Sequence, residues 1–163
     1  MQSKKRKRNE RSSPSKTMST KTEMASAKFL SGYNCAQAVV YAFHDEAGLG
    51  EDLALKLATG LGGGMGRKQE VCGALTGGIL VLGLRHGRGR TGDRAATELT
   101  YARTRELMDR FAAKHGSCLC RQILQGYDIA TEEGRQRAKA DDLHNKVCQP
   151  CVQTVVELLE GMK

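Results

Sequence analysis

Aromatic residues, prolines and long apolar runs are all scarce in this chain of 163 residues, and each shortage excludes a class of protein. Aromatics make up 4% of the residues, tryptophan is absent and only two prolines occur. β-Sandwiches and barrels depend on aromatic and β-branched strands separated by Gly/Pro turns, so we expect no such fold. The longest apolar stretch, Gly77–Leu84, is less than half the roughly 18 residues of a membrane span, which excludes a transmembrane helix.

The net charge of +8 is concentrated at the N-terminus. Residues 1–22 contain eight Lys or Arg residues and one Glu, a net charge of +7, so the rest of the chain is close to neutral. Residues 1–20 also lack apolar periodicity, which predicts a disordered basic leader. Nucleic-acid binding is therefore expected only weakly and only through this leader.

The cysteine count bears on the cellular compartment. Six cysteines are too few for a disulfide-stapled secreted scaffold of this length. No apolar segment follows the basic cluster, so the pattern of a signal peptide is missing. Cytosolic thiols more often serve redox chemistry or metal binding than structural disulfides. We therefore expect a cytoplasmic protein with free cysteines.

Apolar residues after position 20 recur with the period of an α-helix nearly throughout the chain. We expect one domain, residues 21–163, folded as a compact all-α bundle of about six to eight helices without strands. Asn34 and Ser117 are expected helix N-caps, and Gly116 ends the longest helix. The predicted helices cover residues 20–30, a segment after Asn34, and residues 51–59, 70–86, 93–115, 117–125 and 131–140, followed by a last helix that contains Val152 to Leu159.

A glycine-rich run, Gly60–Gly66, separates two of these helices. It has neither the Lys-Ser/Thr of a phosphate loop nor the spacing of a dinucleotide-binding motif. Further glycines lie inside the next helix, where each costs ~1 kcal/mol relative to alanine. We expect them to permit close approach of a neighbouring helix or a cofactor beside Cys72. The residues predicted to surround a cofactor in this way are Gly63, Gly64, Gly66, Gly73 and Gly77.

Every cysteine lies at or near the start of a predicted helix. Unpaired backbone N–H groups and the positive end of the helix dipole favour a thiolate there. Thiolate is the form that binds metals or attacks disulfides, so the coincidence predicts a redox or metal site. The six residues are Cys35, Cys72, Cys118, Cys120, Cys148 and Cys151.

The histidines carry a weaker signal. His86 and His115 each precede a glycine at a predicted helix end, where a cation suits the dipole. His144 lies four residues before Cys148 and would share its face if the last helix begins early. No Ser/His/Asp set or carboxylate pair stands out, so a hydrolytic site is not expected.

Four motifs occur in a fixed order along the chain. They are Gly32-Tyr-Asn-Cys35-Ala-Gln-Ala-Val, then Gly-Gly-Gly-Met-Gly with Cys72-Gly-Ala-Leu-Thr-Gly77, then Cys120-Arg-Gln-Ile-Leu, and a Cys before Val-Val-Glu-Leu-Leu. Together they resemble the C-GCAxxG-C-C family of prokaryotic redox-active proteins, over about residues 24–160. The resemblance implies a helical protein that holds an iron–sulfur cluster or another prosthetic group. The site residues that it implies are Cys35, Cys72, Cys120 and Cys148, with Cys151 and Cys118 as further candidates.

The sequence therefore predicts a metal-binding protein that transfers electrons through an iron–sulfur cluster to an unknown redox partner protein. Two alternatives stay open. Cys148-Gln-Pro-Cys151 has the spacing of a dithiol motif, which would make the protein a thiol–disulfide oxidoreductase without metal. Cys118 and Cys120 with Cys148 and Cys151 have spacings suited to a zinc-stabilised adaptor. A homo-oligomer is compatible with each interpretation.

Overall fold

The computed structural model of the protein describes residues 17–163. Within that range the chain forms eight α-helices and no strand, which confirms the predicted all-α fold. The predicted leader, residues 1–20, falls mostly on residues 1–16, outside the described part. The helices are α1 (Thr20–Leu30), α2 (Cys35–Phe43), α3 (Glu51–Ala58), α4 (Gly73–His86), α5 (Arg94–His115), α6 (Cys120–Ile123), α7 (Glu132–Ala140) and α8 (Gln149–Gly161).

Two short turns complete the described helices. A 3-10 turn, η1 (Thr59–Leu61), follows α3, and a π turn, η2 (His144–Cys148), leads directly into α8. In the π turn the backbone N–H of Gln149 donates to the carbonyl of His144, five residues back. π turns inside helices are frequent at functional sites.

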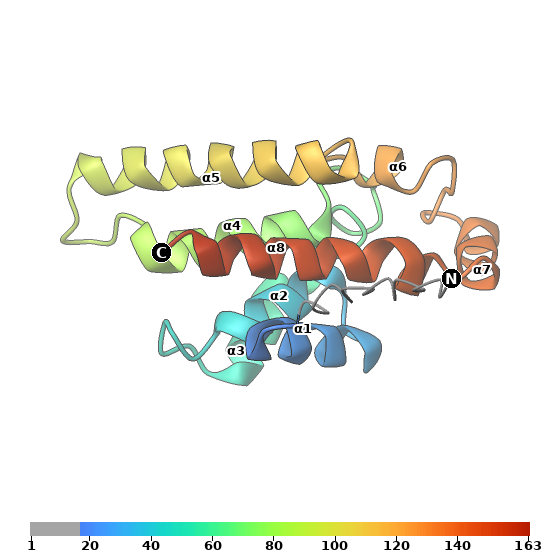
Figure 1. Ribbon diagram of the computed structural model, residues 1–163, viewed down its shortest axis with the longest axis horizontal. Coiled ribbons are helices and arrows are strands. Elements are labelled where there is room, and N and C mark those ends of the chain that lie inside the picture. Colours follow the sequence, from blue (N-terminus) through green and yellow to red (C-terminus); the bar gives the residue numbers. More distant parts are fainter. Residues whose placement is uncertain (1–16) are drawn as a thin grey trace, which may run out of the picture.

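Helices α4 and α8 run through the middle of the molecule (Figure 1). In this view α5 lies along one side, α1 to α3 lie on the other, and α6 and α7 lie at the end where α8 begins. α4 packs against α2, α5 and α8, and α8 also packs against α1. The core is therefore built around these two central helices, and its largest buried side chains include Phe29, Phe43, Phe111, Leu75 and Leu82.

The backbones of α2 and α4 touch at two glycines. A Cβ atom on Gly77 would lie 2.8 Å from the carbonyl oxygen of Ala36 and 3.0 Å from its Cα. A Cβ on Gly73 would lie 3.0 Å from the carbonyl oxygen of Leu61. The neighbour whose close approach these glycines permit is thus α2 and the turn that follows α3, which places the starts of α2 and α4 next to each other.

Two predicted helix starts are wrong. The helix expected from residue 70 begins at Gly73, because Val71 forms an antiparallel bridge with Leu119. The same pairing delays the start of α6, whose N-cap is Leu119 rather than the expected Ser117. The other expected boundaries agree to within about two residues, including the Asn34 cap, whose side chain accepts the backbone N–H of Gln37.

The glycine loop contains a left-handed turn. Residues 63–67 all have positive φ, between 59° and 66°. Left-handed backbone costs a residue with a side chain roughly 1–2 kcal/mol, yet Met65 and Arg67 adopt it. Hydrogen bonds close the turn, from the N–H of Gly66 to the carbonyl of Gly60 and from Glu70 to Gly64, both at 3.0 Å. The predicted loop is therefore an ordered structure that folds back over the start of α4.

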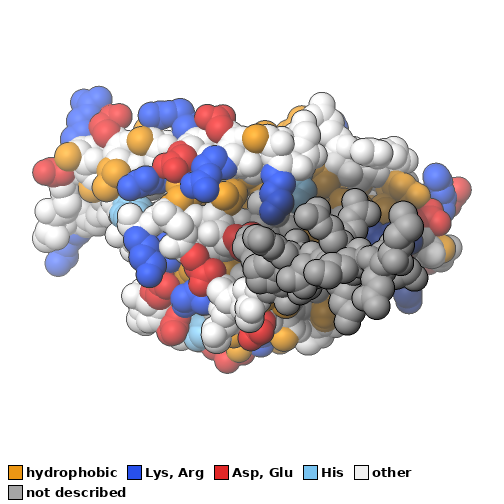
Figure 2. All heavy atoms as spheres, viewed as in Figure 1, with side chains coloured by type: hydrophobic (Ala, Val, Ile, Leu, Met, Phe, Trp, Pro, Cys, Tyr) orange, Lys and Arg blue, Asp and Glu red, His pale blue; other side chains and the backbone are white. Residues whose placement is uncertain are grey.

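Basic and acidic side chains are interspersed over the outer face of α5, together with a few exposed hydrophobic ones such as Leu99 and Tyr101 (Figure 2). Ion pairs within the helix join Arg94 to Glu98, and both Arg103 and Arg110 to Glu106. None of the helices between residues 17 and 163 is both long and apolar enough to cross a lipid bilayer.

The α2–α4 contact leads to a matched pair of glycine variants. Gly77→Ala should lower the free energy of unfolding by about 1–2 kcal/mol, because its Cβ meets backbone that cannot move aside. Gly83→Ala on the same helix should instead raise it by up to about 1 kcal/mol, since nothing lies within 4 Å and alanine is the better helix former. Urea unfolding of both variants measures the difference. A shift of the same sign in both would contradict the close contact.

Candidate functional site

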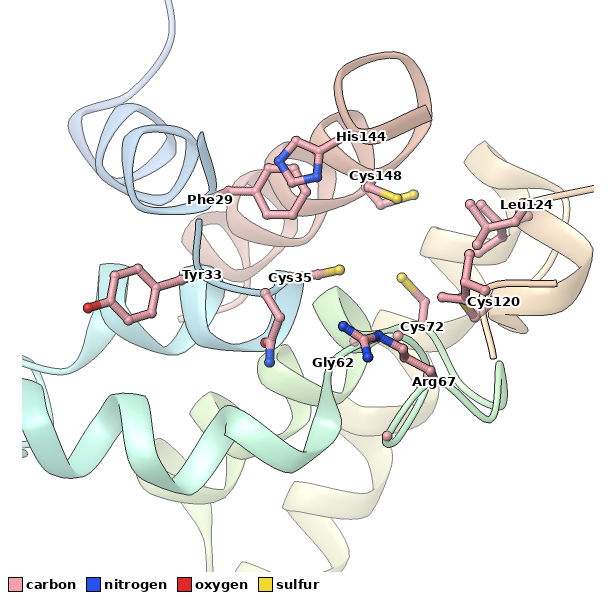
Figure 3. Close-up of a pocket in the computed structure, with 18 of the residues that line it drawn as sticks. Phe29, Tyr33, Cys35, Gly62, Arg67, Cys72, Cys120, Leu124, His144 and Cys148 are labelled. Atoms are coloured by element: carbon pink, nitrogen blue, oxygen red, sulfur yellow. The ribbon is translucent and has the colours of Figure 1, made fainter. Parts of the chain in front are cut away.

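Five cysteines line one cavity of about 450 Å³ at the end of the bundle where α8 begins. They are contributed by four parts of the chain that are remote in sequence. Figure 3 shows the thiols of Cys35, Cys72 and Cys148 directed toward a common space. The predicted convergence is therefore present, and the lining thiols are Cys35, Cys72, Cys120, Cys148 and Cys151.

Cys35 occupies the most favourable position for a thiolate. It is the first residue of α2, and its sulfur interacts with the Cys148 thiol. It also accepts hydrogen bonds from the backbone N–H groups of Gly63, in the left-handed turn, and Ala74, in the first turn of α4. The Cys148 thiol and these N–H groups lower the pKa of Cys35 against the opposing effect of burial. Cys35 therefore ionises more readily than Cys72, Cys120 and Cys148, whose pKa values are raised.

The neighbouring thiols show the opposite shift. The pKa of Cys148 is raised by its hydrogen bond with Cys35 and by burial. The pKa of Cys72 is raised by a hydrogen bond with Cys151, by burial and by the charge of Cys35. Burial raises the pKa of Cys120 to about 12, with a further contribution from Cys35. One ionised thiol therefore disfavours the ionisation of the others in the absence of a positive charge.

Backbone pairing holds Cys72 and Cys120 at the cavity. The N–H of Cys72 donates to the carbonyl of Cys118 at 2.8 Å, and the N–H of Cys120 donates to the backbone carbonyl of Glu70 at 2.7 Å. Gly64 permits the loop to close over this pair, because a Cβ there would lie 2.8 Å from the Cβ of Cys120. The two cysteines, 48 positions apart in numbering, are thus positioned by one short stretch of main-chain hydrogen bonds.

Two polar residues that the sequence analysis missed brace this stretch. Gln69 is buried, and its side chain donates to the carbonyl of Tyr127 at 2.8 Å and accepts the N–H of Ile129 at 3.1 Å. Arg121 donates to the carbonyl of Gln69 at 3.1 Å and forms an ion pair with Glu70. Arg121 directly follows Cys120 in the motif Cys120-Arg-Gln-Ile-Leu, and this position could have pointed to a role at the site. No feature of the neighbouring sequence distinguishes Gln69.

Cys118 does not join the other cysteines. It is absent from the residues that line the cavity, and its thiol donates to the carbonyl of Met108 at 3.5 Å. Burial raises the pKa of this thiol. The four cysteines of the predicted zinc adaptor are therefore not brought together around one point.

Cys151 has a histidine neighbour that the sequence analysis assigned otherwise. Its Sγ lies 3.7 Å from Nδ1 of His115, and Nε2 of His115 lies 2.9 Å from the hydroxyl of Thr154. Burial lowers the pKa of His115, so the ring is neutral near pH 7 rather than the helix-end cation that was expected. The contact joins α5 to α8 and depends on packing between residues 36 positions apart.

His144 lies on the same cavity as Cys148, as expected if the last helix begins early. The π turn provides that early start, and the His144 ring stacks on Phe29 with 3.9 Å between ring centroids. Arg67 also lies on the cavity rim, as Figure 3 shows. The predicted residues Gly63, Gly64, Gly66 and Gly73 line the cavity, whereas Gly77 does not and serves the helix contact instead.

Comparison with known protein families shows to which family the chain belongs. A family model described as "Putative redox-active protein (C_GCAxxG_C_C)" matches residues 33–162. The chain belongs to this family. The C_GCAxxG_C_C match covers all six cysteines and confirms the resemblance found in the sequence. No curated protein and no solved structure matches the chain.

The contrast between Cys35 and its neighbours can be measured in the reduced, metal-free protein. Because its pKa is lowered, Cys35 should become reactive toward iodoacetamide at lower pH than Cys120, whose pKa is raised. Peptide mass spectrometry over a pH series gives the midpoint for each cysteine, which is independent of differences in access. Cys118 serves as a comparison outside the cavity. Equal midpoints for Cys35 and Cys120 would contradict the hydrogen bonds assigned to Cys35.

Proposed function

We propose that the protein transfers electrons through an iron–sulfur cluster held by Cys35, Cys72, Cys120 and Cys148. The observation that carries this proposal is the convergence of these thiols on one cavity of about 450 Å³. Four cysteine thiolates are the usual ligands of such clusters, and the bound cluster supplies one-electron transfer. Membership of a redox-active family supports the same chemistry.

The donor set of the cavity fits an iron–sulfur group better than a single ion. Asp, Glu and Lys are absent from the described residues that line it, which disfavours hard cations such as magnesium or calcium. Within residues 17–163, no three His, Cys, Asp or Glu side chains are gathered closely enough to hold one metal ion. The thiols line a cavity of about 450 Å³, which has room for an inorganic group of several atoms.

The electrostatics of the cavity support a cationic occupant. The pKa values of Cys72, Cys120 and Cys148 are all raised, so several thiolates together are unfavourable without added positive charge. Bound metal provides that charge and favours the deprotonated ligands. The N–H groups of Gly63 and Ala74 point at the Cys35 sulfur, and hydrogen bonds of this kind tune the potential of a bound cluster.

Cys148 is our choice for the fourth ligand over Cys151. Cys148 interacts with Cys35 across the cavity, whereas the Sγ of Cys151 contacts His115 on the neighbouring helix. Cys151 is also almost completely buried, at 1% exposure. We therefore assign it to the wall of the cavity, where its hydrogen bond with Cys72 helps to orient that ligand.

A second candidate function is thiol–disulfide exchange without metal. The contact between Cys35, with its lowered pKa, and Cys148 is the observation that favours it. Oxidation would join the two sulfurs, release two protons and pass two electrons to the disulfide of a partner protein, which becomes two thiols. In this geometry the exchanging pair is Cys35 with Cys148, rather than Cys148 with Cys151 as the sequence spacing suggested.

The state of the cysteines bears on where the protein works. All six are free thiols in the structure, which supports our proposal of a reducing, cytoplasmic compartment. In either candidate function the electrons are exchanged with a separate redox partner protein, because the transfer needs a donor or acceptor outside this site.

Cysteine-to-serine variants test the ligand assignment. Cys35→Ser, Cys72→Ser, Cys120→Ser and Cys148→Ser should each lose most bound iron and sulfide, because a serine hydroxyl is not ionised near neutral pH. Cys118→Ser, outside the cavity, is the matched control and should retain both. Iron and sulfide analysis with visible spectra, on anaerobically purified protein, gives the readout. Full cofactor content in Cys72→Ser would overturn the proposal. Thiol–disulfide exchange predicts instead that only Cys35→Ser and Cys148→Ser abolish activity.

Removal of the cofactor should also lower thermal stability. The four ligands come from segments that meet only in the folded chain, so binding adds to the free energy of unfolding. Calorimetry before and after anaerobic treatment with an iron chelator measures the change, with Cys72→Ser as a variant that should not respond. An unchanged melting temperature in the treated wild-type protein would contradict a cofactor embedded in the core.

A further inference from the structure

A second cavity of about 500 Å³ adjoins the thiol cavity. Its volume lies within the roughly 300–1,000 Å³ typical of small-molecule sites. The two cavities share five lining residues, so a molecule in the second would have one end beside the thiols. The shared residues are Arg67, Leu124, Ile129, His144 and Cys148.

The second cavity combines apolar walls with a cationic rim. Helix α7 and the segment after it contribute Ala138 and Leu143, which face the cavity together with Leu124 and Ile129. These four side chains offer an apolar surface to the body of a ligand. This is the usual composition of a small-molecule site, in which a few polar groups on apolar walls fix the orientation.

Three basic side chains line the same cavity. Arg135 is already engaged, because it donates to the carbonyls of Ile129 and Ala130 at 3.1 and 3.0 Å. The side chains of Arg67 and Lys139, in contrast, make no hydrogen bond or ion pair with any residue between 17 and 163. Two cations at this cavity are therefore available to a ligand.

One acidic residue also lines the cavity and limits the positive charge. The carboxylate of Asp142 accepts a hydrogen bond from the side-chain amide of Asn145 at 2.7 Å. Arg67, Arg135 and Lys139 also line the cavity, so the formal net charge of its Asp, Lys and Arg side chains is +2. The electrostatic preference is for an anion.

Arg67 is the better placed of the two free cations. It lines both cavities, at the point where they adjoin, and its guanidinium carries donors in a planar fork that matches a carboxylate. Its backbone adopts φ of 66° in the left-handed turn, a strained conformation for a residue with a side chain. The loop thus holds an unpaired arginine at the junction despite its conformational cost.

We propose that the second cavity binds a small organic carboxylate, with its carboxylate on Arg67, Lys139 adding to the attraction, and its apolar body against Leu124 and Ile129. Because Arg67 and Cys148 both line the junction of the two cavities, the carboxylate end of the ligand then lies at the edge of the thiol cavity. Cys148 lines both cavities, but the side chains proposed to contact the ligand, Arg67, Lys139, Leu124 and Ile129, are not cluster ligands, so the two proposals can be tested separately.

Calorimetric titration of the full-length protein with hexanoate and with the neutral hexanamide tests the site. Hexanoate should bind at least tenfold more tightly than hexanamide, since only the carboxylate has a negative charge and two acceptor oxygens for a bidentate ion pair with Arg67. Arg67→Gln should weaken hexanoate binding about tenfold and leave hexanamide unchanged. Arg94→Gln, an exposed arginine away from both cavities, is the matched control and should bind like the wild-type protein.

A second variant addresses the cavity itself. Ala138→Phe fills the apolar wall from α7 and should abolish binding of both probes, while iron and sulfide content stays as in the wild-type protein. Equal affinity for the two probes, or equal loss in Arg67→Gln and Arg94→Gln, would overturn the assignment to Arg67. Unchanged hexanoate binding in folded Ala138→Phe protein would place the anion elsewhere and overturn the proposal.

Discussion

The contact between α2 and α4, made where Gly73 and Gly77 have no side chains, determines where the thiols lie. Because the backbone of Ala36 touches Gly77, the first turns of the two helices lie next to each other and the sulfur of Cys35 meets the N–H of Ala74. A thiol at the start of one helix is thereby stabilised by the start of another. The glycine loop and α8 then approach Cys35 from the remaining sides, so the cavity is organised around this one sulfur.

This arrangement joins the stability of the fold to the chemistry of the site. Glycines inside a helix weaken it, and a left-handed turn that includes Met65 and Arg67 weakens the loop. Both unfavourable features lie beside the thiols, where they allow main-chain N–H groups to approach sulfur without intervening side chains. Hydrogen bonds from the main chain are rigid and cannot titrate, so the backbone fixes part of the environment of Cys35, beside the larger effect of the Cys148 thiol.

Local patterns predicted most of the helices, because caps such as Asn34 and the helix end at Gly116 depend on neighbours along the chain. The convergence of thiols followed from their positions at helix starts together with the family motif. What could not be predicted depends on contacts between distant segments. The pairing of residues 70–72 with residues 118–120 delays two helices, and the packing of α5 on α8 turns His115 toward Cys151. The exclusion of Cys118 has the same origin. Cys118 lies only two positions before Cys120, yet its thiol contacts the carbonyl of Met108 on α5 and does not line the cavity.

The π turn before α8 has a consequence for how this protein can diverge. Such a turn contains one residue more than an α-helix would use, and each residue rotates a helix by about 100°. The additional residue between His144 and Gln149 therefore rotates the segment directly before it, residues 141–143, relative to α8. Loss of a single codon between His144 and Cys148 would turn this segment about α8, and with it Leu143, which lines the second cavity. The second cavity can thus be reshaped in one evolutionary step by a change in length, while the cysteines of the other helices keep their places.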